Sequence, residues 1–187
     1  MKRLEARHKQ FQDTALPHLN ALYRTARQLA GEDAASDLVQ DTYLRAWKYF
    51  ETFDPTSNCR AWLFRILRNV SADRWRRSRL EIPWVEGEHA PEPYYDWEED
   101  FPGQQFSGDV QQALEELPEE YRWAVLLVDV EEFSYQETAQ ILSCPIGTVM
   151  SRINRGRRML ARLLRSERDG QMRECRGRGR KPETEKS

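Results

Sequence analysis

The sequence lacks the features of a membrane-spanning, disulfide-bonded or metal-binding protein. No apolar run approaches the roughly 20 residues that a transmembrane helix needs. The first residues are charged and polar, and they contain no apolar stretch typical of a signal peptide. Cys59, Cys144 and Cys175 are widely spaced, which gives neither a disulfide framework nor a CxxC pair for a metal. We therefore expect a cytoplasmic protein with free thiols, no metal site and no other cofactor.

Residue patterns typical of catalysis are also scarce. His8, His18 and His89 fall in separate segments, and the chain has neither a glycine-rich phosphate loop nor a nucleophile elbow. Acidic residues are plentiful, but many of them lie in a segment rich in proline and glycine that is poorly suited to a preorganised site. The sequence therefore predicts that the chain is not an enzyme.

The charge is strongly segregated although the formal net charge is only −2. Residues 60–79 carry a series of arginines that Asp73 alone opposes, and residues 148–165 carry only basic charges. Between these segments, residues 80–109 contain acidic residues but no lysine or arginine. Because the local field and not the sum decides what a polyanion meets, two basic segments around an acidic one favour binding to nucleic acid.

The apolar spacing predicts an all-α fold of two small helical domains. Apolar residues recur at helical intervals, and no sustained alternation indicates a sheet. Prolines and glycines interrupt the acidic stretch, which therefore reads as a flexible linker. The expected boundaries are residues 1–80 for the first domain, 81–109 for the acidic linker, 110–167 for the second domain and 168–187 for a disordered tail.

Three helices are expected in the first domain. The first covers residues near 10–30 and ends at Gly31, and Asp33 is expected to cap the second. A turn at residues 54–58 separates the second helix from the third. The inward positions of the third helix are expected to be Leu63, Ile66, Leu67 and Val70.

The second domain contains the pattern of a helix-turn-helix. Ser134 and Glu137 fit a capping box at the start of a short helix, and a longer helix begins near Ile146 after a tight turn. The longer helix has an apolar stripe, in which Gly156 would permit close backbone approach; the stripe is Ile146, Val149, Ile153, Gly156, Leu160 and Leu163. Its other side has residues that can read bases or hold phosphates in a major groove. The alternative is an ordinary helical hairpin with a solvated basic face.

The basic segment 60–79 also contains aromatic residues. Arginines hold a nucleic-acid backbone while exposed aromatic rings stack on unpaired bases, so this segment suits a single strand. The alternative is that Trp62 and Phe64 belong to the core, since aromatic side chains beside a helical stripe usually do.

Four segments resemble one protein family. They are DLVQDTYLRAW at residues 37–47, RAWLFRILRN at 60–69, LPEEYR at 117–122 and PIGTVMSR at 145–152. The first resembles the polymerase-binding signature of extracytoplasmic-function (group IV) sigma factors, and the second resembles their promoter-melting and minus-ten-recognition segment. The last two together resemble their minus-thirty-five-reading domain. The resemblance is closest to the stress- and redox-responsive branch of that family.

The resemblance implies a role for three groups of residues. Those expected to bind core polymerase are Asp37, Gln40, Asp41 and Tyr43. Those expected to bind the minus-ten element are Ser57, Asn58, Cys59, Trp62, Arg65, Arg68, Asn69, Arg76 and Arg77. Those expected at the minus-thirty-five element are Thr148, Met150, Ser151, Arg152, Asn154, Arg155 and Arg158.

The implied function is that of a sigma factor. Such a protein binds core RNA polymerase and directs initiation at specific promoters, here of a stress regulon under the control of an anti-sigma factor. Its expected partners are core polymerase, promoter DNA as duplex and as melted strand, and an anti-sigma protein. In this family the acidic linker occupies channels that later receive RNA. Two alternatives remain open: a LuxR-like or response-regulator-like activator that binds duplex DNA alone, and an adaptor whose basic helices bind acidic proteins.

Overall fold

The computed structural model describes residues 2–79 and 108–177, and the side chains of residues 4–76 and 108–165. Every regular element in these ranges is helical, which confirms the all-α class. The predicted linker lies outside them except for its last two residues, and so does the end of the tail. The elements are α1 (Lys2–Ala15), η1 (Leu16–His18), α2 (Leu19–Ala30), α3 (Glu32–Tyr49), η2 (Phe50–Thr52), α4 (Cys59–Arg79), α5 (Gly108–Glu115), α6 (Glu119–Val125), η3 (Leu126–Val130), α7 (Tyr135–Leu142) and α8 (Ile146–Gly177).

The first predicted helix is wrong in its extent and continuity. Helical structure begins at Lys2 and is interrupted by the 3₁₀ turn η1, in which a proline occupies one of the first positions. Pro17 has no backbone N–H to donate, so an unbroken α-helix across it would lose a hydrogen bond. The predicted end is confirmed, because Gly31 follows α2 with a φ of 80° that favours glycine.

The predicted cap of the second helix is also wrong. Helix α3 begins at Glu32, with Gly31 at the capping position and no side-chain cap. Asp33 lies instead in the first turn, where a negative charge interacts favourably with the positive end of the helix dipole.

The helices α1–α4, called the N-terminal half below, pack around one apolar core. Leu63, Leu67 and Val70 of α4 are buried as predicted, whereas Ile66 is only half-buried. On α1, the ring of Phe11 makes edge-to-face contacts with the rings of α3 and η2. This core fixes α3 and α4 side by side, so that their polar faces form one continuous surface.

The helices α5–α8, called the C-terminal half below, contain the predicted helix-turn-helix. The capping box at α7 is confirmed: Ser134 Oγ accepts a hydrogen bond from the amide of Glu137, and the Glu137 carboxylate accepts one from the amide of Ser134. Ser143 ends α7 in the left-handed conformation, with a φ of 51°. The short turn that follows then delivers the chain to α8.

The predicted stripe on α8 is correct except at its start. Val149, Ile153 and Gly156 are buried, and Leu160 and Leu163 are half-buried, but Ile146 is 46% exposed. Ile146 is the first residue of the helix, one turn before Val149 meets Ala124 of α6. At Gly156 a Cβ atom would stand only 2.8 Å from Val125 Cγ2, which confirms the predicted close approach.

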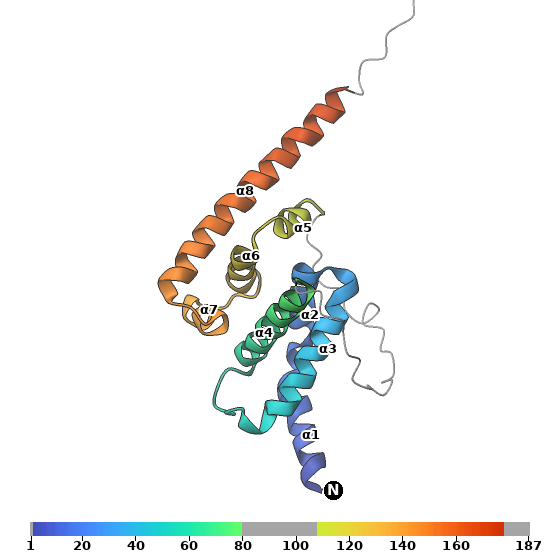
Figure 1. Ribbon diagram of the computed structural model, residues 1–187, viewed down its shortest axis with the longest axis vertical. Helices are drawn as coiled ribbons and strands as arrows, with labels where there is room; N and C mark the ends of the chain where they lie inside the picture. Colours follow the sequence, from blue (N-terminus) through green and yellow to red (C-terminus); the bar gives the residue numbers. More distant parts are fainter. Residues whose placement is uncertain (1, 80–107, 178–187) are drawn as a thin grey trace, which may run out of the picture.

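The predicted tail differs from the structure over part of its length. Helix α8 continues to Gly177, so residues 168–177 are helical and not an irregular tail. Figure 1 shows this helix extending well beyond the other elements. Apart from Gly170 and Gly177, this stretch is rich in residues that favour helices, such as Arg, Glu, Gln and Met.

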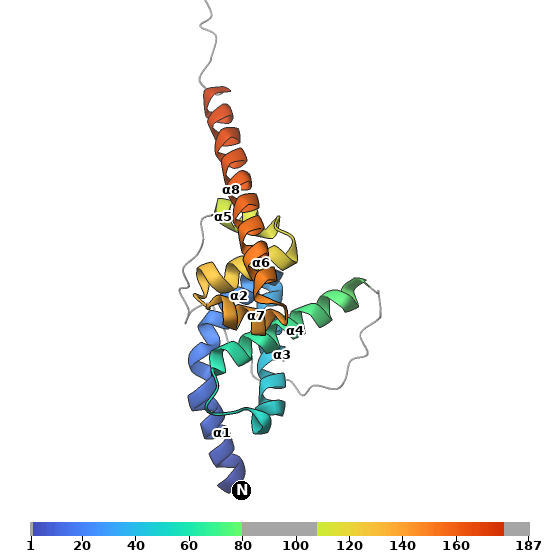
Figure 2. The ribbon, with the colours of Figure 1, turned by 90° about the vertical axis from the view of Figure 1, so that its left-hand side faces the viewer.

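The two halves pack against each other. Trp123, Leu127, Phe133 and Ile141 belong to the same buried cluster as the core of the N-terminal half. Helix α7 lies beside α4, and α5 and α6 lie beside α2 (Figure 1, Figure 2). Thus the tether predicted from the sequence joins two parts that share an apolar interface.

Candidate nucleic-acid and polymerase interfaces

Helix α8 presents an exposed polar face opposite its buried stripe. Met150 is 49% exposed, and Ser151, Asn154, Arg155 and Arg158 are also exposed. Thr148 is half-buried near the start of the helix, and its carbonyl accepts a hydrogen bond from Ser151 Oγ. Because α6 and α7 pack against the other side of α8, this face is supported from behind and remains exposed.

Two arginines of α8 are turned toward their own half. Arg152 donates to a Glu120 carboxylate oxygen at 3.1 Å and to the sulfur of Cys144 at 3.7 Å. Arg157 donates through Nε and Nη2 to both carboxylate oxygens of Asp129. The predicted base-reading role of Arg152 therefore requires it to leave Glu120, whereas Arg155 lies on the exposed face.

The predicted minus-ten loop is ordered by its own hydrogen bonds. The Asp54 carboxylate accepts hydrogen bonds from the amide and hydroxyl of Thr56, which lower the pKa of Asp54. Asn58 caps α4, since its Oδ1 accepts a hydrogen bond from the amide of Ala61 at 3.2 Å. Ser57 and Asn58 are exposed, as capture of a base would need.

The neighbouring Cys59 is less accessible than its predicted role suggests. Its side chain is only 9% exposed, and burial raises the pKa of the thiol to about 11. Cys59 belongs to the apolar core cluster, so it anchors the end of the predicted minus-ten loop to the core. Its contact with DNA stays a prediction.

The aromatic residues of α4 divide between core and surface. Phe64 is fully buried, which supports its alternative role in the core. Trp62 is half-buried and packs on Phe53, with 4.8 Å between ring centroids. Trp75 is 50% exposed farther along the helix. On the same helix, Arg65, Asn69 and Arg76 are exposed and Arg68 is half-buried, while the side chain of Arg77 lies outside the described residues.

Helices α3 and α4 form a charged surface at the predicted polymerase site. Asp37 and Gln40 are exposed on α3. Asp41 accepts two hydrogen bonds from Arg74 of α4, the shorter of 2.7 Å. Arg45 in turn donates to Asp73, which with the ion pair to Arg76 holds the pKa of that carboxyl below its usual range.

Tyr43 differs from the other predicted polymerase-binding residues. Its hydroxyl donates to the carbonyl of Ala15 at 3.0 Å, and burial raises the pKa of the phenol. The side chain therefore ties α3 to the end of α1. Its predicted contact with polymerase would involve only the part that remains accessible.

The structure places one acidic residue that the sequence did not single out at the boundary between the halves. The side chain of Glu131, just after η3, is fully buried. Its Oε1 accepts hydrogen bonds from Arg24 and Thr25 of α2, and Oε2 accepts one from Arg60 of α4. We call Arg24, Thr25, Arg60 and Glu131 the interdomain cluster. In the sequence, Glu131 stands next to Glu132 and two positions from Asp129, so nothing marked it as buried.

A second polar contact joins the predicted minus-ten loop to the helix-turn-helix. Asn58 Nδ2 donates to Glu137 Oε1 at 2.8 Å. The hydrogen bonds from Ser134, and to a smaller degree that from Asn58, lower the pKa of Glu137. Thus the residue that caps α4 and the residue that completes the α7 capping box are bonded to each other.

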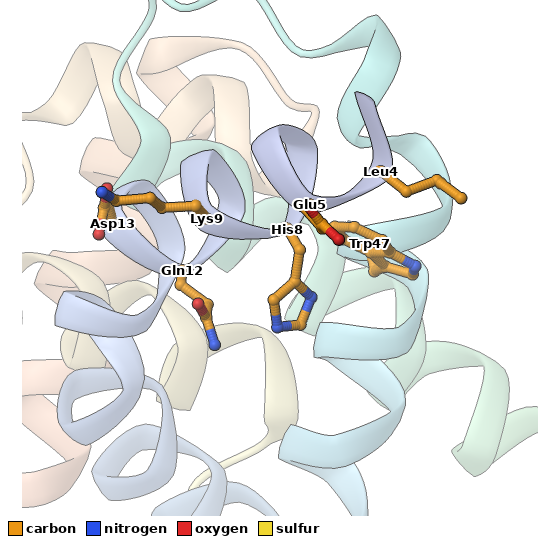
Figure 3. Close-up of a pocket in the computed structure, with 7 residues that line it drawn as sticks. All are labelled: Leu4, Glu5, His8, Lys9, Gln12, Asp13 and Trp47. Atoms are coloured by element: carbon orange, nitrogen blue, oxygen red, sulfur yellow. The ribbon is translucent and has the colours of Figure 1, made fainter. Parts of the chain in front are cut away.

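An open hollow on the N-terminal half lies where α1 meets α3 (Figure 3). The ring of His8 contacts the edge of Trp47, with 5.7 Å between centroids. The Arg7 guanidinium lies 4.5 Å from the centre of the same indole and donates to the Trp47 carbonyl. These contacts hold α1 on α3.

Among the described residues, no cluster of three histidine, cysteine or acidic side chains has the arrangement of a metal site. Within the same residues, none of the helices is long and apolar enough to cross a membrane.

Comparison with known families decides the identity. Residues 15–81 match Sigma-70 region 2, and residues 107–160 match Sigma-70 region 4. Among curated proteins, the chain is 40% identical over 154 residues to the ECF RNA polymerase sigma factor EcfG of Rhodopseudomonas palustris, and the match covers 80% of this chain and 81% of that protein. The chain belongs to the extracytoplasmic-function (ECF) family of sigma-70 factors. It is also 32% identical over 149 residues to the ECF sigma factor SigW of Bacillus subtilis, a match that covers 74% of this chain and 80% of that protein.

Solved structures of similar proteins agree with the fold. The sigma factor RpoE of Bartonella quintana, solved with the anti-sigma factor NepR, aligns with a TM-score of 0.69 at 35% identity over 84% of this chain and 98% of that one. CnrH, solved with the cytosolic domain of CnrY, aligns with a TM-score of 0.63 at 29% identity over 85% of this chain and 90% of that one. The match to region 2 disfavours the alternative of an activator that shares only the helix-turn-helix, because that alternative leaves α1–α4 unexplained.

Proposed function

We propose that this ECF sigma factor binds core RNA polymerase through α3 and directs initiation at promoters that α4 and α8 recognise. The observation that carries the proposal is the ordered match to regions 2 and 4 on a chain whose α8 has one buried and one exposed, basic face. The chain itself performs no chemistry, since phosphodiester bond formation belongs to the polymerase. It would act in the cytoplasm, where polymerase and promoter DNA are found.

Three surfaces would bind the polymerase, the minus-ten element and the minus-thirty-five element. Asp37, Gln40 and Asp41 on α3 would contact the polymerase, with Tyr43 supporting that helix. Ser57 and Asn58 would meet the minus-ten element, and exposed arginines of α4 would hold the melted strand. On α8, Asn154 and Arg155 would contact base edges, and Thr148, Ser151 and Arg158 would hold phosphates.

Control by an anti-sigma protein is part of the proposal. The sigma factor RpoE, which is 35% identical to this chain, was solved with the anti-sigma factor NepR, and CnrH was solved with the cytosolic domain of CnrY. The expected regulon is a stress regulon, as the resemblance to the stress-responsive branch implies.

Promoter-dependent transcription with purified core polymerase tests the proposal. Wild-type chain is expected to give transcripts from specific start sites that core alone does not give. Gln40→Ala is expected to weaken core binding, whereas Lys48→Ala, also exposed on α3, is expected to leave it unchanged. We choose Gln40 over Asp41 because Asp41 is paired with Arg74, so its loss would also leave an arginine of α4 without its carboxylate partner.

The matched test on α8 compares two exposed arginines. Arg155→Ala is expected to reduce transcription from promoters that depend on the minus-thirty-five element by about 10- to 100-fold, since one bidentate base contact discriminates by about 1–3 kcal/mol. Arg162→Ala, two turns farther along the same helix, is expected to have little effect. A chain that binds duplex DNA alone but never directs initiation would overturn the proposal.

A further inference from the structure

We infer that the chain by itself is held in a closed, DNA-incompetent arrangement by the interdomain cluster, with Glu131 as the latch between the halves. This inference rests on the proposed function, because it concerns how the two DNA-reading surfaces become available. Its structural basis is the fully buried Glu131 carboxylate, which receives hydrogen bonds from two helices of the other half.

The cluster satisfies a charge that would otherwise be expensive to bury. Burying a carboxylate is tolerated only when it is paired and hydrogen-bonded. Arg24 and Thr25 reach one oxygen at 2.9 and 3.1 Å, and Arg60 reaches the other. Arg60 also donates to the Glu131 carbonyl at 2.7 Å, so one arginine holds both the side chain and the backbone. The donors all come from the N-terminal half and the acceptor from the C-terminal half.

Apolar and polar contacts around the cluster reinforce it. The rings of Phe64 and Phe133 meet edge to face across the interface, with 5.0 Å between centroids. The Arg60 guanidinium lies 4.4 Å from the centre of the Phe133 ring. Asn58 adds its hydrogen bond to Glu137 at the outer edge of the interface. The closed arrangement therefore buries apolar surface and a satisfied ion pair together.

The closed arrangement cannot place both reading surfaces on a promoter at once. The minus-ten and minus-thirty-five elements are about 25 base pairs apart by their names, or about 85 Å along a straight duplex at 3.4 Å per pair. Asn58 is bonded directly to Glu137, and Ile146 at the start of α8 lies only nine positions after Glu137 in the chain. Even fully extended, nine residues span only about 32 Å. The halves must therefore separate when the chain engages a promoter.

Separation exposes Glu131 and its arginines to water. The interdomain cluster therefore sets the equilibrium between the closed and the open arrangement. The surface that would bind polymerase, on α3, lies away from α7 and α8 (Figure 1). Core polymerase can therefore dock on α3 while the halves are closed, and opening follows when the C-terminal half meets its own sites. This order deepens the proposed function by adding a conformational step before promoter recognition.

Energy transfer between dyes on the two halves tests the latch in the chain alone. We would attach them by non-thiol chemistry at Lys9 and Ala161, which are exposed on α1 and α8. Wild-type chain is expected to show one high-efficiency population. Glu131→Lys places a positive charge against Arg24 and Arg60, and is expected to raise the open-to-closed ratio at least about 100-fold, as expected when a buried pair is broken. Arg24→Glu, in the other half, is expected to open the chain as well.

A matched control and a charge exchange make the result specific. Asp129→Lys reverses a charge two residues from Glu131, but Asp129 pairs with Arg157 inside the C-terminal half, so this variant is expected to stay closed. The double variant Arg24→Glu/Glu131→Lys is expected to recover part of the closed population. If it recovers none, the loss is due to damage within the halves and the latch is wrong. Glu131→Lys and Arg24→Glu variants that stay as closed as wild type would also overturn it.

Adding core polymerase and promoter DNA separates the latch from the proposed function. Wild-type chain is expected to change from high to low transfer efficiency as specific transcripts appear. Specific transcripts from a chain that stays closed would refute the latch and leave the proposed function standing. A chain that opens in the Glu131→Lys variant but never directs transcription would retain the latch and refute the proposed function.

Discussion

Gly156 offers a direct test of how α8 packs on α6. A Cβ atom at this position would stand 2.8 Å from Val125 Cγ2, 3.3 Å from Tyr121 Cβ and 3.4 Å from the Tyr121 carbonyl oxygen. Val125 is only 3% exposed, and its branched side chain has little rotamer freedom, so it cannot move aside easily. Gly156→Ala therefore inserts a methyl group into a space that is already filled.

Two opposing effects set the change in folding stability that Gly156→Ala causes. Replacing glycine with alanine inside a helix stabilises by about 0.5–1 kcal/mol. Overpacking a tight core costs about 1–3 kcal/mol, and here the obstruction includes a backbone-proximal Cβ atom as well as a methyl group. We expect a net loss of about 1 kcal/mol, which lowers the Tm by about 2–4 °C for a chain of this length.

Gly147 in the same helix is the matched control. A Cβ atom there would have no neighbour within 4 Å. Gly147→Ala is therefore expected to raise the Tm or leave it unchanged, because only the effect on chain entropy remains. Thermal unfolding followed by circular dichroism would compare the two variants directly.

A second substitution isolates the contact that is responsible. Val125→Ala alone leaves a cavity and destabilises the protein. In that background, Gly156→Ala is expected to be neutral or stabilising, because Cγ2 is gone, and the coupling is expected to be about 1–2 kcal/mol. If Gly156→Ala raises the Tm of the wild-type chain as much as Gly147→Ala does, the close packing of α8 on α6 is refuted.

Three further predictions follow from single side chains. Ser134→Ala is expected to lose about 1 kcal/mol by removing the acceptor for the Glu137 amide, whereas Ser134→Thr keeps it; equal urea midpoints for the two variants would contradict the cap. Cys59, with a pKa raised from 9.0 to about 11, is expected to react with iodoacetamide about 100-fold more slowly than a cysteine in an unfolded peptide; site-resolved mass spectrometry showing equal rates would contradict its burial. Burial lowers the pKa of His18 in the folded state, so the unfolded state binds more protons and stability is expected to fall as the pH drops through about 6.5. His18→Gln should lose less stability than wild type between pH 7.5 and 5.5, and an equal loss would exclude His18 as the cause.

Local patterns predicted the helical class, the α7 capping box and the buried stripe of α8 because each depends on residues a few positions apart. The break at Pro17 was also visible locally, since a proline without a backbone N–H disrupts an α-helix, but the apolar spacing on either side concealed it. The start of α3 at Glu32 was missed because Gly31 serves two helices at once, ending α2 and preceding α3.

The interface between the halves could not be predicted in the same way. Glu131 meets Arg24 and Thr25 from more than 100 positions away, and no periodicity links residues across such a separation. The same holds for Arg152, whose spacing on α8 suggested an exposed base-reading residue while its guanidinium pairs with Glu120 of α6. Sequence thus identified the types of residue at the candidate site but not the ion pairs that occupy some of them.

The arginines in these ion pairs differ in how readily they can exchange their carboxylate partner for a DNA phosphate. Arg74, Arg152 and Arg157 pair with carboxylates that are 39%, 50% and 32% exposed, and such surface pairs are worth about 0–1 kcal/mol. DNA can exchange these partners at little cost, so all three can join a phosphate-binding surface. Arg24 and Arg60 differ, because their shared carboxylate is fully buried and would be left without a partner. Nucleic acid can recruit those two arginines only after the halves have separated and Glu131 has regained water.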